Sequence, residues 1–123
     1  MSAMRELSLA RLLEGKGQPE SAIEHYMTAL SLFQEAGHGI NASVTRLDMG
    51  TLCLSVGDID AAREAAAHVK RFASISRTQL LTMRLNRLLG LIEIEDGDFT
   101  KARNILAEND EQTSKRPEAS LRL

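Results

Sequence analysis

The stretches GDIDAA (57–62) and GDFTKA (97–102) are two copies of one short phrase, and GQPESA (17–22) is a third, more divergent copy. Their first glycines lie 40 residues apart, which indicates an internal repeat of that period. The match extends to both sides of the phrase, because apolar, small and glycine positions recur in the same order in each unit. Positions that align at this offset include Leu9, Met49 and Leu89, and Ala22, Ala62 and Ala102.

Each unit has the pattern of two helices joined by a tight turn. Apolar residues recur at intervals of three and four, as in Ile23, Tyr26 and Leu30, which is the periodicity of an amphipathic helix. The first glycine of the phrase suits the end of a helix, where a left-handed backbone is least costly for glycine. The Asp that follows it in two copies suits an N-cap, and Pro19 suits the first position of a helix. Each unit is therefore predicted to be a helical hairpin.

The predicted fold is all-α, a right-handed superhelical array of three helical hairpins. Its six helices are expected at about 3–16, 18–36, 41–56, 58–74, 78–96 and 98–110. Residues 1–110 form one predicted domain, with repeats at about 3–40, 41–80 and 81–110. Residues 111–123 form a polar tail that contains Pro117 and is predicted to be flexible.

The composition argues against several classes of function. A hydrophobic fraction of 43% and a charged fraction of 26% are ordinary for a folded domain. The formal net charge of −2 and the aromatic content of 3% argue against nucleic-acid binding. No apolar run approaches the roughly 20 residues of a membrane span, and charges at Arg5, Glu6 and Arg11 do not fit a signal peptide. Because the single cysteine, Cys53, cannot form an internal disulfide, we expect a cytoplasmic protein.

The stretches LDMGTLCLSVGDIDAAREAA (47–66) and LNRLLGLIEIEDGDFTKARNIL (85–106) resemble tetratricopeptide repeats. The signature of that family has a Leu-Gly pair in the first helix, a glycine at the turn and an alanine in the second helix. The residues that match it are Met49, Gly50, Gly57 and Ala62, and then Leu89, Gly90, Gly97 and Ala102. The period of 40 exceeds the usual repeat of about 34 residues. This longer form resembles the repeats of bacterial signalling regulators, which include multidomain transcription activators.

The resemblance implies a non-enzymatic module that binds a protein or peptide, in a bacterial signalling or assembly context. In such arrays the first helices of the hairpins line a concave groove. The residues expected to face it are Met4, Leu7, Arg11, Val44, Leu47, Thr51, Leu54, Arg84, Arg87, Leu88 and Leu91. This set is apolar with three arginines and no acid, so an acidic, amphipathic segment would complement it. Alternatively, the arginines only solvate this face or pair with nearby Glu14, Asp48 and Glu95.

A second interpretation is a structural or sensory segment of a larger regulator, for example a multidomain transcription activator, or a self-associating scaffold. Repeat arrays normally finish with a polar capping helix, whereas here only the proline-containing tail follows Leu106. Ile105 and Leu106 would then be partly uncovered. A homodimer through this C-terminal edge, a bound partner or further sequence would each cover them.

No catalytic, cofactor or metal site is expected, and the chain is not predicted to be an enzyme. His25, His38 and His68 have no Cys or carboxylate at the spacing of metal ligands. Cys53 aligns with a core position and is expected to be a buried structural thiol rather than a nucleophile. The acidic run IEIEDGD (92–98) lacks the ligand pattern of a calcium loop. A helix end followed by an N-cap explains that run better.

Overall fold

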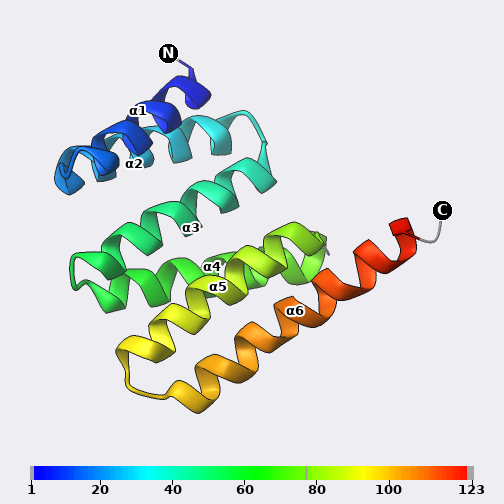
Figure 1. Ribbon diagram of the computed structural model, residues 1–123. Coiled ribbons are helices and arrows are strands. Elements are labelled where there is room, and N and C mark those ends of the chain that lie inside the picture. The colour runs from blue at the N-terminus through cyan, green and yellow to red at the C-terminus, as the bar shows by residue number, and fades with distance from the viewer. Residues whose placement is uncertain (1, 77, 122–123) are drawn as a thin grey trace.

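The computed structural model describes the backbone of residues 2–76 and 78–121, and the side chains of these residues as far as residue 110. The described residues form six helices and no strand. The helices are α1 (Ala3–Gly15), α2 (Pro19–Glu35), α3 (Gly39–Ser55), α4 (Ile59–Ser76), α5 (Gln79–Glu95) and α6 (Phe99–Leu121). Figure 1 shows them as three hairpins stacked one after another. The predicted all-α array of three helical hairpins is therefore confirmed.

The hairpin turns have the backbone form that the repeated phrase predicts. Gly57 has a φ of 93°, and its N–H and that of Asp58 donate to carbonyls in the last turn of α3, at 3.1 and 2.8 Å. This pair of bonds is a Schellman motif, which needs a left-handed residue. Gly17 and Gly97 have φ values of 75° and 86°. Asp58 also caps α4, since its Oδ1 accepts the N–H of Ala61 at 3.1 Å.

Several helix ends differ from the predicted ones. The turn between α2 and α3 is as tight as the turns within hairpins, because Gly37 also has a positive φ of 74°. As a result α3 begins at Gly39 rather than near residue 41. At the C-terminal end α6 continues to Leu121, well beyond the expected end near 110, and its last turns extend away from the other helices (Figure 1). The flexibility of residues 111–123 stays a prediction. The boundary between the repeat domain and this tail, at residue 110, stays a prediction as well.

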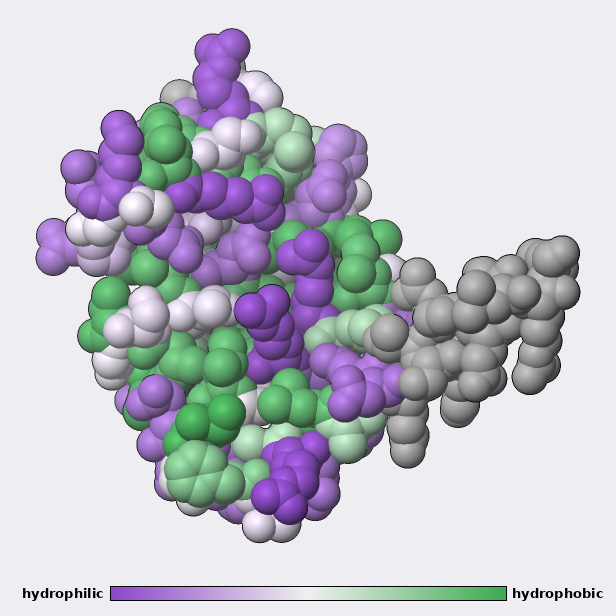
Figure 2. Space-filling view, viewed as in Figure 1, coloured by the Kyte–Doolittle hydropathy of each residue, from purple (hydrophilic) through white to green (hydrophobic). Residues whose placement is uncertain are grey.

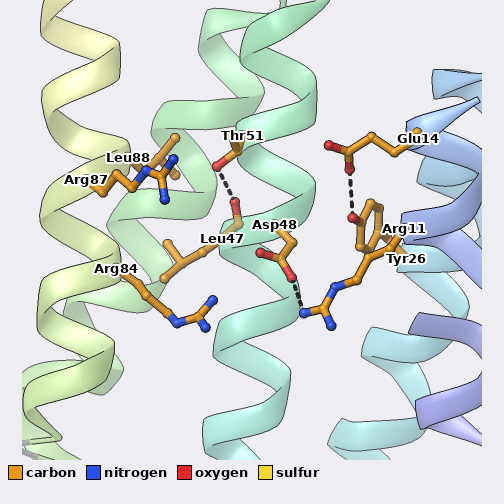
Figure 3. Close-up of a pocket in the computed structure, with 10 residues that line it drawn as sticks. Arg11, Glu14, Tyr26, Leu47, Asp48, Thr51, Arg84, Arg87 and Leu88 are labelled. Atoms are coloured by element: carbon orange, nitrogen blue, oxygen red, sulfur yellow. Dashed lines mark hydrogen bonds and ion pairs between the residues drawn. The ribbon is translucent and has the colours of Figure 1, made fainter. Parts of the chain in front are cut away.

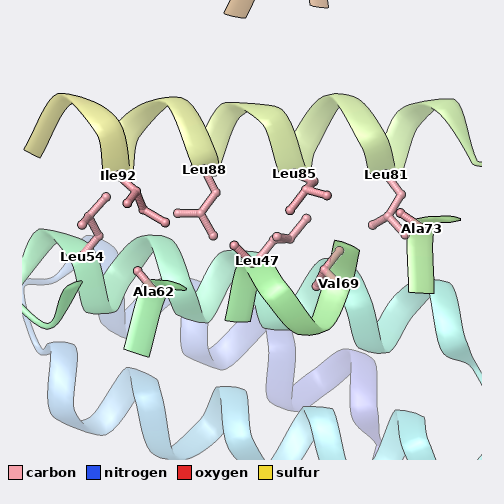
Figure 4. Packing of buried hydrophobic residues seen from close by; sticks show 10 residues of the cluster. Leu47, Leu54, Ala62, Val69, Ala73, Leu81, Leu85, Leu88 and Ile92 are labelled. Atoms are coloured by element: carbon pink, nitrogen blue, oxygen red, sulfur yellow. The ribbon is translucent and has the colours of Figure 1, made fainter. Parts of the chain in front are cut away.

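Two apolar clusters hold the hairpins together. The first lies among α1, α2 and α3, and Tyr26, which is 1% exposed, is its largest side chain. The second joins the second hairpin to the third, with α5 lying across α3 and α4 (Figure 4). It contains Leu47, Leu54, Ala62, Ala66, Val69, Ala73, Leu81, Leu85, Leu88 and Ile92. Small residues permit close approach of the helices, since a Cβ added to Gly50 would lie 2.9 Å from the Cβ of Ala65.

Candidate functional site

A cavity of about 410 Å³ opens on the face that α1, α3 and α5 form together (Figure 3). We call it the groove pocket, and its lining residues are Arg11, Glu14, Gly15, Tyr26, Leu47, Asp48, Thr51, Arg84, Arg87 and Leu88. Nine of the ten come from the first helices of the three hairpins, and Tyr26 alone comes from a second helix, α2. The pocket therefore lies on the face where the sequence predicted a groove.

The helical spacing of the lining residues gives the pocket an apolar floor and a charged rim. Leu47 and Leu88 are 4% and 1% exposed and form the floor. Arg84 and Arg87 stand three residues apart on α5, so they project from neighbouring turns on one face. Both arginines are exposed, and Figure 3 shows them extending from α5 toward α3. A side chain that enters the pocket would meet leucine below it and guanidinium groups beside it.

Arg11 on the opposite wall is already paired. Its Nη2 lies 2.8 Å from Oδ2 of Asp48, which links α1 to α3. The hydrogen bond to Asp48 is the main cause that raises the pKa of Arg11. The side chain of Arg11 is 51% exposed, and an ion pair exposed to this degree contributes at most about 1 kcal/mol. The alternative in which an arginine pairs with Asp48 therefore holds for Arg11.

A second carboxylate in the pocket is held by Tyr26. The phenol donates a hydrogen bond to Oε1 of Glu14 at 2.7 Å. Burial, and then this hydrogen bond, raise the pKa of Tyr26 well above its ordinary value. The phenol is therefore protonated at neutral pH and stays a donor to Glu14. Glu14 and Asp48 thus add two acids to the lining, whereas the predicted set of groove residues contained none.

The two arginines on α5 differ from Arg11. Among the side chains that the structure describes, neither Arg84 nor Arg87 has an ion-pair partner. Because the acids of the pocket are engaged by Arg11 and Tyr26 on its α1 side, the α5 side carries the uncompensated positive charge. The pocket is thus polarised, with its cationic wall on α5.

Six of the eleven predicted groove residues line the groove pocket, namely Arg11, Leu47, Thr51, Arg84, Arg87 and Leu88. The other five lie elsewhere. Leu7 and Leu54, 5% and 8% exposed, belong to the two apolar clusters because they face a neighbouring helix. Val44 is partly buried against the second cluster. Met4 lies beside a separate hollow near the start of α1, and Leu91 lines a cavity between α5 and α6.

The remaining candidate residues make structural contacts. Nδ1 of His25 lies 2.6 Å from Oε2 of Glu6 and so joins α2 to α1. Cys53 is buried as predicted, and burial raises the pKa of its thiol. The described part of the chain holds no group of three or more side chains that could bind a metal ion. Within that same part, no helix combines the length and the apolar character needed to cross a membrane.

Comparison with known protein families agrees with the architecture. The family model described as tetratricopeptide repeat matches residues 1–75, a segment that begins before α1 and ends within α4. The match covers more than half of the chain. Comparisons with curated proteins and with solved structures find no match.

Proposed function

Because the chain belongs to the tetratricopeptide repeat family, we propose that it is a non-enzymatic module that binds a protein or peptide segment in the groove pocket. Repeats of this family generally mediate protein–protein interaction, and arrays of helical hairpins offer an extended surface for a partner. We further propose a cytoplasmic location, and a bacterial signalling or assembly context on the basis of the 40-residue period.

The observation that carries the proposal is the pair of exposed arginines, Arg84 and Arg87, beside a leucine floor. Guanidinium groups pair with carboxylates through two parallel hydrogen bonds, which gives both charge and geometric selectivity. Apolar side chains of a partner would lie against Leu47 and Leu88. The segment that fits both features is acidic and amphipathic. Its carboxylate would lie toward α5, because Asp48 and Glu14 make the α1 side unfavourable for an acid.

The test uses peptides selected on the immobilised chain from a random displayed library, followed by titration calorimetry. We expect the selected peptides to combine Asp or Glu with apolar residues. Arg84→Ala and Arg87→Ala should each weaken binding about two- to fivefold, the effect of an ion pair of about 0.5–1 kcal/mol, with a loss of affinity at higher salt. The matched control is Arg71→Ala, an exposed arginine of α4 outside the pocket. Equal weakening by Arg71→Ala, or selection of basic peptides, would contradict the proposal.

Replacement of Leu47 or Leu88 by alanine cannot separate a loss of peptide binding from a loss of folding stability. Leu47 and Leu88 belong to the second apolar cluster, so their replacement by alanine would cost about 2–5 kcal/mol of folding stability. Thr51 is the better position, because it is exposed and lines the pocket. Thr51→Glu should repel an acidic peptide and reduce binding more than either arginine variant. Thr51→Val, which replaces the hydroxyl by a methyl group and adds no charge, should leave the affinity within about twofold of the wild type.

A further inference from the structure

A second cavity, of about 610 Å³, lies on the outer side of the third hairpin between α5 and α6. We call it the end groove. Its walls include Leu80, Arg84, Arg87 and Leu91 of α5, and Leu106 and Asp110 of α6. Leu80 is 55% exposed, and Figure 2 shows hydrophobic side chains at the surface in the lower part of the molecule, where this hairpin lies. The surface is distinct from the groove pocket, although Arg84 and Arg87 border both.

The repeat register identifies what kind of surface the end groove is. Leu47 and Ala66 lie 40 residues before Arg87 and Leu106, and both are buried against α5 in the second apolar cluster. On the second hairpin, the residues at this position pack against the next hairpin. On the third hairpin, the residues at the same position form the end groove. Within the described part of the chain, no seventh helix covers it. The end groove thus corresponds in the repeat register to the internal interface between the second and third hairpins.

The charges of the end groove differ from those of the internal interface. Arg87 stands where the second hairpin has Leu47, and Asp110 lies on the α6 wall; Leu91 and Leu106 line the same groove. One wall is therefore cationic and the other carries a carboxylate. A surface with opposite charges on its two walls is complementary to itself after a two-fold rotation, which sets α5 of one copy against α6 of the other.

We propose that the end groove binds the end groove of a second copy of this chain, forming a symmetric dimer. In this arrangement the arginines Arg84 and Arg87 of each copy pair with Asp110 of the other, and the leucines of both copies pack between these charges. A purely acidic or purely basic partner would match one wall and be repelled by the other. Because Arg84 and Arg87 border both surfaces, the dimer would occupy the arginines that the groove pocket offers to a peptide, so dimer formation and peptide binding would compete.

The experiment is a charge exchange, read out as mass in solution by sedimentation at several concentrations. One variant carries Asp110→Arg, and a second carries Arg84→Glu with Arg87→Glu. Each variant alone would place like charges against each other, and an equimolar mixture would restore opposite charges at both halves of the interface. Glu24→Arg, an exposed position on α2, makes the same charge change as Asp110→Arg away from the groove. Far-UV circular dichroism verifies that each variant is helical.

We expect the wild type and Glu24→Arg to form dimers with the same dissociation constant. Asp110→Arg alone and the double arginine variant alone should each raise that constant at least about tenfold, and their mixture should form a heterodimer. A wild type that stays monomeric overturns the proposal. Dimers that both variants leave intact, or a mixture that remains monomeric, overturn it as well. Because Asp110 does not line the groove pocket, loss of dimerisation in Asp110→Arg is separable from loss of peptide binding.

Discussion

Replacement of Gly50 by alanine tests how closely the two helices of the second hairpin approach each other. A Cβ at this position would lie 2.9 Å from Cβ of Ala65 and 3.2 Å from Cδ2 of Leu88. The Cβ of Ala65 is attached directly to the backbone of α4, so it cannot rotate away, and the helices themselves must shift. Gly90 is the matched position in the third hairpin. There the added Cβ would lie 2.9 Å from Cγ of Leu106, which rotation of a half-buried side chain can move.

The expected magnitude follows from two opposing effects. Overpacking of a rigid contact costs about 1–3 kcal/mol, and replacement of glycine by alanine inside a helix returns about 1 kcal/mol. Gly50→Ala should therefore lower the free energy of unfolding by about 1 kcal/mol. Gly90→Ala should leave it nearly unchanged, because rotation of Leu106 relieves most of the clash. For a chain of this length, the difference corresponds to about 4 °C in melting temperature.

Urea unfolding followed by far-UV circular dichroism measures both variants, and an unchanged m-value would show that the comparison is of native-state stability. The opposite order, in which Gly50→Ala is as stable as the wild type while Gly90→Ala is destabilised, would contradict the expected packing. That result would mean that the close contact of α3 with α4 is absent or that it is relieved without cost.

Three further predictions concern the turns, the pocket wall and the thiol. Gly57→Val should lower the free energy of unfolding, measured in urea, by more than about 1 kcal/mol. The φ of 93° strains a side chain at this position, and the added Cβ would find no atom within 4 Å to pack against. Tyr26→Phe should cost about 1 kcal/mol in the same assay, since Glu14 loses its hydrogen-bond donor. Cys53 should react slowly with a disulfide reagent in the native chain and rapidly in urea, because burial shields the thiol and raises its pKa. That raised pKa also means that the Cys53 contribution to stability is present at neutral pH and is lost as the pH rises through the thiol's titration range.

The turns were predictable from the sequence because their chemistry is local. Only glycine adopts a left-handed backbone without cost, and Asp58 directly after Gly57 has a carboxylate at the right distance for the next N-cap. Three copies of that local signal at one spacing then define the hairpins. The extension of α6 had no comparable signal, because residues 111–121 lack the apolar periodicity that indicates a helix against a core.

The lining of the pocket was only partly predictable from the sequence. Helical spacing shows which residues share a side of a helix, but it does not show which of them face the groove and which are buried against the neighbouring helix. Leu7 and Leu54 are buried in this way, although their spacing from Arg11 and Leu47 suits the groove. The role of Tyr26 depends on a long-range contact. Its ring belongs to the core, and its hydroxyl reaches Glu14 only because α2 folds back on α1.

Binding in the groove pocket is tested most directly by nuclear magnetic resonance of the arginine side chains during titration with a selected acidic peptide. The Nε–Hε signals of Arg84 and Arg87 should shift as the peptide binds, because their guanidinium groups form the cationic wall of the groove pocket. The signals of Arg71 and Arg103, exposed on α4 and α6 outside the pocket, should stay in place. Shifts of Arg71 or Arg103 with Arg84 and Arg87 unchanged would contradict binding in the groove pocket.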